Sequence, residues 1–127
     1  MNTWIAVGIG GALGAMARHG VGVAVSRIMG TSVPYATATV NLLGCFVIGA
    51  LAGALAGGFL RLGDTSRALI FVGIIGGFTT FSSLGLDTLT LVRTGDLGMA
   101  MLNVAIQVGF GLAAVFLGFS IAQLIGN

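Results

Sequence analysis

The chain has 127 residues, of which 57% are hydrophobic and 6% are charged, and its formal net charge is +2 at neutral pH. Soluble domains carry about 25% charged residues, so this composition, with a mean hydropathy of +1.13, excludes a soluble class. The excess of five basic over three acidic residues is small and scattered, which argues against nucleic acid as a partner. We therefore predict an all-α membrane protein that has the lipid bilayer as its surroundings.

Long uncharged stretches divide the chain into four candidate membrane-spanning helices. A helix needs about 20 apolar residues to cross a bilayer, and uncharged runs of that length or close to it cover residues 28–60, 68–86 and 97–127. No linker, low-complexity tract or second domain separates these runs. We predict a single transmembrane domain over residues 1–127, multi-pass in the inner (plasma) membrane, with helices at roughly 4–27, 33–60, 67–93 and 97–125.

The first predicted helix is apolar except for Arg18 and His19. A signal peptide is the alternative, but this stretch lacks a basic start and Arg18 interrupts its apolar part. A guanidinium this deep in a membrane must reach the interface, pair with a partner or face water. A water-filled vestibule beside Arg18 would raise the local concentration of anions.

The second predicted helix carries Asn41 and the single cysteine of the chain, Cys45. A single cysteine excludes an internal disulfide, and we expect Cys45 to be a small core residue. Gly49, Gly53 and Gly57 recur every four residues, a spacing that lets helix backbones approach closely. We expect most of these glycines to pack helices within one subunit.

The third predicted helix contains the stretch "GGFTTFSS" at residues 76–83. Gly76-Gly77 followed by Thr79-Thr80 predicts a break at mid-membrane, and backbone groups freed there must be buried in protein or line a cavity. Carbonyls at such a break can bind a cation. The ring edge of Phe81 is electropositive and can contact a small anion, although core filling by the two phenylalanines is the alternative interpretation.

The fourth predicted helix carries Asn103 and Gln107, four residues apart and thus on one face. Together with the hydroxyls of the third helix, these amides donate hydrogen bonds without a fixed charge. Such a lining suits an ion that must bind and then leave, because a fixed countercharge would trap it. The alternative is that Ser and Thr bond back to the preceding helical turn. Asp87 is either a conduction or proton-carrying residue or a member of an ion pair near the interface.

Arginines in the predicted connections show no bias between the two sides of the membrane. Arg61 and Arg67 fall on the side of both termini, whereas Arg27 and Arg93 fall on the opposite side. Because arginine and lysine in short loops set the orientation, this balance gives the chain little reason to choose one. Two interpretations remain open: another feature orients the chain, or both orientations insert and pair as an antiparallel dual-topology homodimer.

Four segments together resemble the small Fluc (CrcB) fluoride channels over nearly the whole chain. The stretch "GGFTTFSS" resembles the family signature GG-x-[ST]-TFS-T-F-S, and "GGALGAMAR", ending at Arg18, is similar to a motif of the family's first helix. The segment "TATVNLLGCFVIG", with Thr37 and Asn41, is similar to the second-helix pattern GT-x-x-x-N-L-x-G. "LDTLTLVRTGD" follows where the family has an acidic residue before the last helix.

The resemblance implies an antiparallel dual-topology homodimer with two parallel fluoride pores. It also implies a structural Na⁺ on the dimer axis, held by backbone carbonyls at positions that correspond to Gly76 and Thr79. Arg18 would lie near the aqueous vestibule. The pore residues carried over by motif are Phe81, Asn41, Thr80, Ser82 and Ser83.

The chain departs from the family pattern at three positions. Leu84 replaces the second phenylalanine and Gly85 replaces the serine after it, so half of the aromatic pair and one hydroxyl are missing from the pore. We expect Gln107 to cover part of that loss, and we include both Leu84 and Gln107 in the predicted pore. Ala36, where the second-helix pattern has Gly, is a small-for-small change.

The sequence thus predicts a passive, fluoride-selective channel that exports fluoride from the cytoplasm and lowers its toxicity. The alternative is a proton-coupled small multidrug exporter, which is also a four-helix dual-topology dimer. Such exporters need a carboxylate in the first helix, and the first acidic residue here is Asp64. A scaffold subunit is a third interpretation. An enzyme is not expected, because one His and one Cys offer no nucleophile–base pair or metal cluster.

Overall fold

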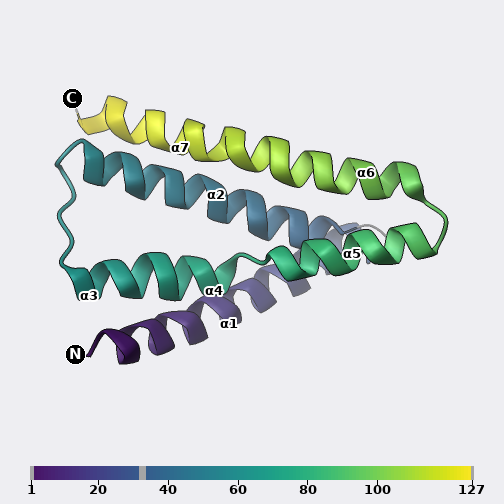
Figure 1. Cartoon of the computed structure of the whole chain (residues 1–127), viewed down its shortest axis with the longest axis horizontal. Helices are drawn as coiled ribbons and strands as arrows, with labels where there is room; N and C mark the ends of the chain where they lie inside the picture. Colours follow the sequence, from purple (N-terminus) through teal and green to yellow (C-terminus); the bar gives the residue numbers. More distant parts are fainter. Residues whose placement is uncertain (1, 32–33, 127) are drawn as a thin grey trace.

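The computed structural model describes residues 2–31 and 34–126, and all regular structure within them is helical. The chain forms long rods that lie side by side, two of them built from several segments (Figure 1). The first two rods are single helices, the third is interrupted between α4 and α5, and the fourth is continuous. Their segments are α1 (Thr3–Met29); α2 (Tyr35–Ala56); α3 (Asp64–Arg67), the π-helical η1 (Ala68–Ile75), α4 (Gly76–Phe78) and α5 (Phe81–Arg93); and α6 (Leu97–Ala105), the π-helical η2 (Ile106–Phe110) and α7 (Gly111–Gly126).

The predicted helix boundaries hold to within a few residues, and local chemistry explains where they differ. α2 begins at Tyr35, after Pro34 at its N-cap, and residue 33, where the helix was predicted to begin, lies outside the described residues. Proline has no backbone N–H to leave unpaired at a helix start. The same helix ends at Ala56 rather than residue 60. Gly58, two residues on, has a φ of 78°, a left-handed conformation that favours glycine and ends the helix.

Polar side chains cap the N-termini of three of the described helices. The side chain of Asn2 accepts a hydrogen bond from the Trp4 N–H at the start of α1. Asp96 accepts one from the Met99 N–H at the start of α6. Each cap satisfies a backbone donor that has no partner within the helix, and the third cap, on α5, belongs to the helix break.

The break of the third rod lies at Thr79 and Thr80, inside the stretch of Gly76-Gly77 followed by Thr79-Thr80 that predicted it. Both threonines are extended, with φ/ψ of −80°/159° and −154°/113°, whereas the two glycines are helical in α4. β-Branched residues favour extended backbone, and the Thr80 side chain caps α5 by accepting the Ser83 N–H. The predicted break of this helix is therefore confirmed, and within the predicted stretch the two threonines, not the two glycines, leave the helical conformation.

Gly77 serves close packing instead. A Cβ built on Gly77 would lie 2.7 Å from the Gly11 carbonyl oxygen of α1. A Cβ on Gly14 would overlap the Ile74 carbonyl oxygen and lie 2.9 Å from the Phe78 backbone nitrogen. These close approaches hold α1 against η1 and α4, the segments that lead into the break.

Gly49 and Gly53 of α2 do the same against the last rod, where α2 packs extensively along α7 (Figure 1). A Cβ on Gly49 would overlap the Val115 carbonyl oxygen, and one on Gly53 would overlap that of Phe119. The prediction that these two glycines pack helices within one subunit is confirmed. Gly57 instead lies beside the ring of Phe59.

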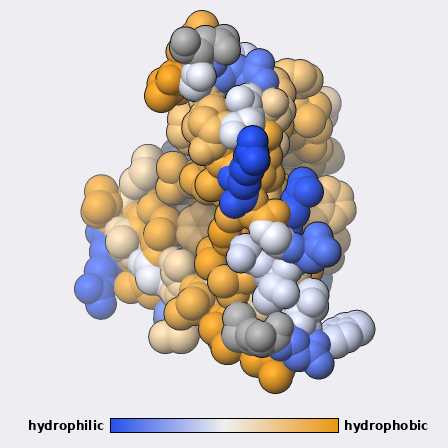
Figure 2. Space-filling model, turned by 90° about the vertical axis from the view of Figure 1, so that its left-hand side faces the viewer, coloured by the Kyte–Doolittle hydropathy of each residue, from blue (hydrophilic) through white to orange (hydrophobic). Residues whose placement is uncertain are grey.

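The outside of the molecule is apolar. α2, the rod Asp64–Arg93 and the rod Leu97–Gly126 are each long and apolar enough to cross a membrane. Figure 2 looks onto the end where α1 begins and α7 ends, and it shows scattered hydrophilic groups on a largely hydrophobic surface. α1 is confirmed as a helix of 27 residues, but it is less apolar than the other three rods, so its membrane crossing stays a prediction.

Candidate functional site

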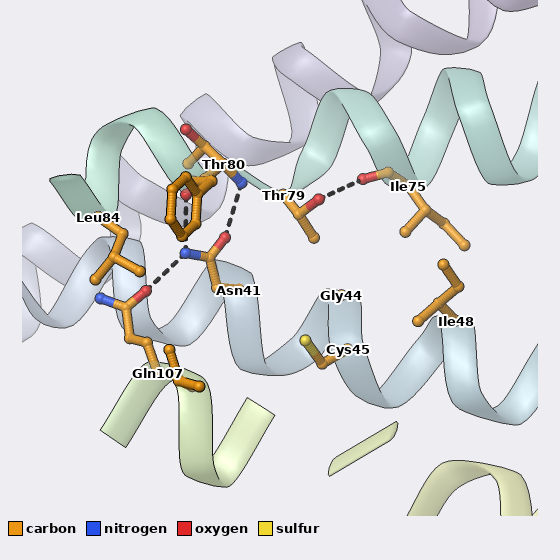
Figure 3. A pocket seen from close by; sticks show the side chains of 11 residues that line it. Asn41, Gly44, Cys45, Ile48, Ile75, Thr79, Thr80, Leu84 and Gln107 are labelled. Carbon is orange, nitrogen blue, oxygen red and sulfur yellow. Dashed lines mark hydrogen bonds between the residues drawn. The ribbon is translucent and has the colours of Figure 1, made fainter. Parts of the chain in front are cut away.

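A cavity of about 290 Å³ lies where α2, the helix break and η2 meet (Figure 3). Its wall is mostly apolar, and its polar groups are neutral amides, hydroxyls and backbone atoms. Gly44 lets α2 approach the break, because a Cβ there would overlap the Thr79 side-chain methyl group. The lining residues that the sequence predicted for the pore or the cation site are Asn41, Thr79, Thr80, Phe81, Leu84 and Gln107.

Asn41 joins α2 to the break by pairing with both backbone groups of one residue. Its Oδ1 accepts the Thr80 N–H at 2.8 Å, and its Nδ2 donates to the Thr80 carbonyl at 3.0 Å (Figure 3). Thr80 is only 8% exposed, so its backbone groups need these partners once the helix no longer supplies them. The side chain of Asn41 therefore takes the place of the missing turn of helix.

A line of side-chain amides continues from Asn41 into the last rod. Asn41 Nδ2 also donates to Gln107 Oε1 at 2.6 Å, and Gln107 Nε2 donates to Asn103 Oδ1 at 2.8 Å. Asn103 and Gln107 are each 6% exposed, and their bond confirms that the two share a helix face. Asn103 Nδ2 then donates to Thr88 Oγ1 at 3.0 Å, which brings in α5.

Hydroxyl groups gather at the start of α5. Thr80 Oγ1 donates to Ser83 Oγ at 3.0 Å and lies 3.2 Å from Ser82 Oγ. Ser83 is half-buried, whereas Ser82 is exposed. The predicted alternative, bonding of hydroxyls to the preceding turn, applies to Thr79 at the break, which donates to the Ile75 carbonyl at 3.1 Å (Figure 3). It also applies to Thr88 and Thr90 in α5, which donate to carbonyls four residues earlier.

The break frees the two carbonyls that were predicted to hold a cation. In an uninterrupted helix the Gly76 carbonyl would accept the Thr80 N–H and the Thr79 carbonyl would accept the Ser83 N–H. Here the Thr80 N–H goes to Asn41 and the Ser83 N–H goes to the Thr80 hydroxyl. Both carbonyls therefore lose their helical donors and keep lone pairs available for another ligand.

The two side chains predicted to stand at the aromatic positions face different surroundings. Leu84 is 6% exposed inside the cavity wall, whereas Phe81 is 82% exposed although it also lines the cavity. A large ring at that exposure has little of this chain over it, and burial of its surface requires lipid or another chain.

Arg18 lies beside a smaller cavity of about 100 Å³, which it lines together with Thr37, Thr80 and Ser83. Thr80 thus lines both cavities, with Arg18 on one side and Asn41 on the other. Farther along α5, Asp87 Oδ2 is buried without a hydrogen-bond partner in the described part of the chain.

Sequence reasoning noted Asn103 but left it out of the predicted site, and it missed Thr88 entirely. Neither lines the main cavity, and nothing in their spacing says that the turn between α5 and α6 brings them within hydrogen-bond distance. Among the signals in the sequence, only the separation of four between Asn103 and Gln107 pointed to this network.

The fold and the site together define a helical, multi-pass membrane protein with a neutral polar site at an interrupted helix. The family model described as "CrcB-like protein, Camphor Resistance (CrcB)" matches residues 5–119. The chain belongs to this family, as the sequence resemblance predicted.

Similar proteins cover almost the whole chain. The "Fluoride-specific ion channel FluC" of Roseiflexus sp. (strain RS-1) is 44% identical over 121 residues, which are 95% of this chain and 97% of that protein. The protein of the same name from Caulobacter vibrioides (strain NA1000 / CB15N) is 42% identical over 123 residues, 97% of each chain. That from Thermus thermophilus is 40% identical over 124 residues, 94% of each chain.

Proposed function

We propose that the chain forms a passive fluoride-selective channel that exports fluoride from the cytoplasm and so lowers its toxicity. The observation that carries this proposal is the cavity at the helix break, whose polar groups are uncharged hydrogen-bond donors and acceptors. Fluoride is small and strongly hydrated, so a pore must replace its water with many close, weak donors. Relatives at 40–44% identity bear the name of fluoride channels, and this supports the same ion here.

The pore residues are the neutral groups around the break, with Arg18 at its vestibule. Thr80 lines both the main cavity and the smaller cavity beside Arg18, which supports a route that passes from one to the other. The Arg18 guanidinium attracts the anion to the vestibule. The neutral groups then bind it weakly enough for it to move on through the pore, because they carry no full countercharge. The residues of the route are Phe81, Asn41, Thr80, Ser82, Ser83, Leu84 and Gln107.

The channel is an antiparallel dual-topology homodimer with two pores. Phe81 beside the cavity and Val72 on the same rod are 82% and 62% exposed in the single chain, and a second copy would cover such a face. Two arginines at each end of the rods favour neither orientation. α1 has 27 residues, about 40 Å at 1.5 Å per residue, which is long enough for the fourth membrane crossing.

A structural Na⁺ on the dimer axis would be held by the carbonyls of Gly76 and Thr79. Neutral oxygens are suitable ligands for a hard cation, and these two carbonyls have lost their helical donors. Two carbonyls from one chain provide only two oxygen ligands for the ion, and the same two carbonyls of a second copy would provide two more. The ion would bring order to the break without placing a fixed negative charge in the pore.

The alternative of a proton-coupled multidrug exporter gains no support. α1 contains no carboxylate, and the relatives are named as channels rather than exporters. The proposal likewise makes the chain an ion channel and not an enzyme.

A fluoride electrode tests the function directly on purified protein reconstituted in liposomes. With sodium on both sides, trapped fluoride is expected to leave rapidly while chloride stays at the rate of protein-free vesicles. Replacement of sodium by N-methylglucamine is expected to slow the efflux. Chloride that leaves as fast as fluoride would disprove selectivity, and fluoride that remains trapped with sodium present would disprove the channel.

A further inference from the structure

The hydrogen-bond donors of Asn41 are fully used. Its Nδ2 has two N–H groups, one donated to the Thr80 carbonyl and the other to Gln107 Oε1. A third acceptor, such as an anion in the cavity, can bind to this amide only if one of these two bonds breaks. The donor that faces the cavity must therefore be sought on the next amide of the line.

The orientation of every amide in the line is fixed by two backbone groups. The Thr80 N–H can only donate, so Asn41 must present Oδ1 to it and Nδ2 to its neighbours. Gln107 must then accept with Oε1 and donate with Nε2, and Asn103 must do the same with its own amide. At the far end the Thr88 hydroxyl accepts from Asn103 and donates to the Leu84 carbonyl at 2.7 Å, which can only accept.

This orientation leaves one N–H of Gln107 available at the cavity. Gln107 Nε2 uses one of its two N–H groups on Asn103 Oδ1, and the other has no acceptor within the described residues. Gln107 lines the cavity, whereas Asn103 does not. Figure 3 shows the Gln107 nitrogen on the side of its amide toward Leu84, another lining residue.

We propose that Gln107 is the amide that donates to fluoride in this cavity and that Asn103 is a positioning residue, held by Thr88, that keeps the Gln107 N–H directed at the ion. The proposal rests on the proposed fluoride channel and adds to it which side chain binds the ion and which residues orient it. Asn41 acts at the other end as the clamp between the helix break and Gln107. Without Thr88, Asn103 could reverse its amide, and Gln107 would then lose the partner that keeps its nitrogen in place.

Two substitutions at Thr88 separate orientation from packing. Thr88→Val keeps the shape of the side chain and removes the hydroxyl, whereas Thr88→Ser keeps the hydroxyl and removes the methyl group. Thr88 does not line the cavity, so neither change alters the wall. We expect roughly tenfold slower fluoride efflux for Thr88→Val, the effect of one lost hydrogen bond, and near-normal efflux for Thr88→Ser. A role in packing alone would give the reverse order.

The side-chain amide of Gln107 can be observed directly, since the chain contains only one other glutamine, Gln123. Protein labelled with ¹⁵N at glutamine side chains should give two pairs of amide proton signals, which Gln123→Glu assigns. We expect sodium fluoride, but not sodium chloride, to shift one of the two Gln107 amide protons and to leave Gln123 unchanged. Thr88→Val should abolish this response, and Thr88→Ser should retain it.

The outcomes distinguish this proposal from the channel itself. If wild-type protein conducts fluoride but the Gln107 signals do not respond to it, or if Thr88→Val behaves as wild type in both measurements, the proposal is wrong and the channel stands. If wild-type protein conducts no fluoride, the proposed function fails. In that case, spectra recorded without fluoride still test the hydrogen bonds that orient Gln107. If those bonds exist, Thr88→Val must bring the two Gln107 amide proton shifts closer together than Thr88→Ser does.

Discussion

At the scale of the residue, the site depends on a small number of neutral polar groups, and each of them needs a hydrogen-bond partner inside the membrane. An unpaired polar group in hydrocarbon is costly, so Asn41, Asn103 and Gln107 are linked to one another and to backbone. The same linkage gives each amide a defined direction. Neutral amides with fixed directions can stabilise an anion in transit without the deep well that a lysine or arginine would create.

Asn41→Asp tests the residue that joins most of these bonds. A carboxylate has nearly the shape of the amide but cannot donate to the Thr80 carbonyl or to Gln107 Oε1, and it repels an anion. Each buried group left without its bond costs about 1–3 kcal/mol, so fluoride efflux from liposomes is expected to fall about a hundredfold or more.

The matched control for this prediction is Gln123→Glu, the same type of change in α7 and outside the cavity wall. Its efflux is expected to equal that of wild type within about twofold, a difference of less than 1 kcal/mol. Wild-type efflux from Asn41→Asp would show that the ion takes a path that avoids this side chain.

At the scale of the element, close helix packing places α1 and α2 against the interrupted helix. Gly14 and Gly77 let α1 lie directly against the segments before the break, and Gly44 lets α2 lie against Thr79. The π-helical segments η1 and η2 flank the same region, and η2 carries Gln107. Segments of this kind often occur at functional sites. Leu84, which stands where the family pattern has a ring, and Gln107 line the same cavity.

Gly14→Ala tests whether this packing supports the break. The new Cβ would overlap the Ile74 carbonyl oxygen and press on the Phe78 backbone nitrogen, and overpacking of this kind costs about 1–3 kcal/mol. We expect a lower thermal midpoint, measured by circular dichroism in detergent, together with slower fluoride efflux.

Gly8→Ala is the control in the same helix, since a Cβ at Gly8 meets nothing within 4 Å. It is expected to leave the thermal midpoint unchanged or to raise it, because alanine favours helix by about 1 kcal/mol over glycine. If both variants melt alike, the contact between α1 and the segments before the break does not limit stability.

At the scale of the whole molecule, the exposed apolar surface and the balance of charge bear on how copies assemble. α2, Asp64–Arg93 and Leu97–Gly126 are bilayer-spanning by length and apolarity, and large apolar side chains such as Phe81 and Phe116 stay exposed on the single chain. In the proposed dimer some of this surface meets a second copy and the rest meets lipid. Such a dimer would need both orientations in one membrane, and the absence of a charge bias between the ends would permit both.

Added charges test the dual topology. One variant, Gly63→Lys with Ser66→Arg, adds two positive charges at the end that carries Arg61 and Arg67. The opposite variant, Thr31→Lys with Thr94→Arg, adds two at the other end, and all four positions are exposed. Since positive residues are retained in the cytoplasm, each variant alone should insert mostly one way and protect cells poorly against fluoride. Co-expression of the two should restore resistance.

Labelling of single cysteines from each side of the membrane reports the orientations in the same cells. The expected result is labelling from both sides for wild type and from one side for each biased variant. Full activity of one biased variant by itself would disprove the antiparallel dimer.

The sequence by itself determined the class and the helices, and it named six of the residues that line the cavity at the break. Its composition excluded a soluble domain, its uncharged runs gave the rods to within a few residues, and its motifs gave the family. It also gave the face shared by Asn103 and Gln107. These features follow from local chemistry, since hydrophobic length, spacing along a helix and motif letters are properties of neighbouring residues.

Only the tertiary structure decided where the helix breaks and which way the amides point. Within the stretch that predicted the break, Gly76 and Gly77 are helical and Gly77 packs closely on α1. The chain is instead extended at Thr79 and Thr80, where Asn41 of another helix accepts the freed Thr80 N–H. Thr88 reached Asn103 only through the turn between α5 and α6. Whether a hydrogen bond forms between distant segments depends on how the folded chain brings donor and acceptor together. No pattern of neighbouring residues along the chain can therefore predict it.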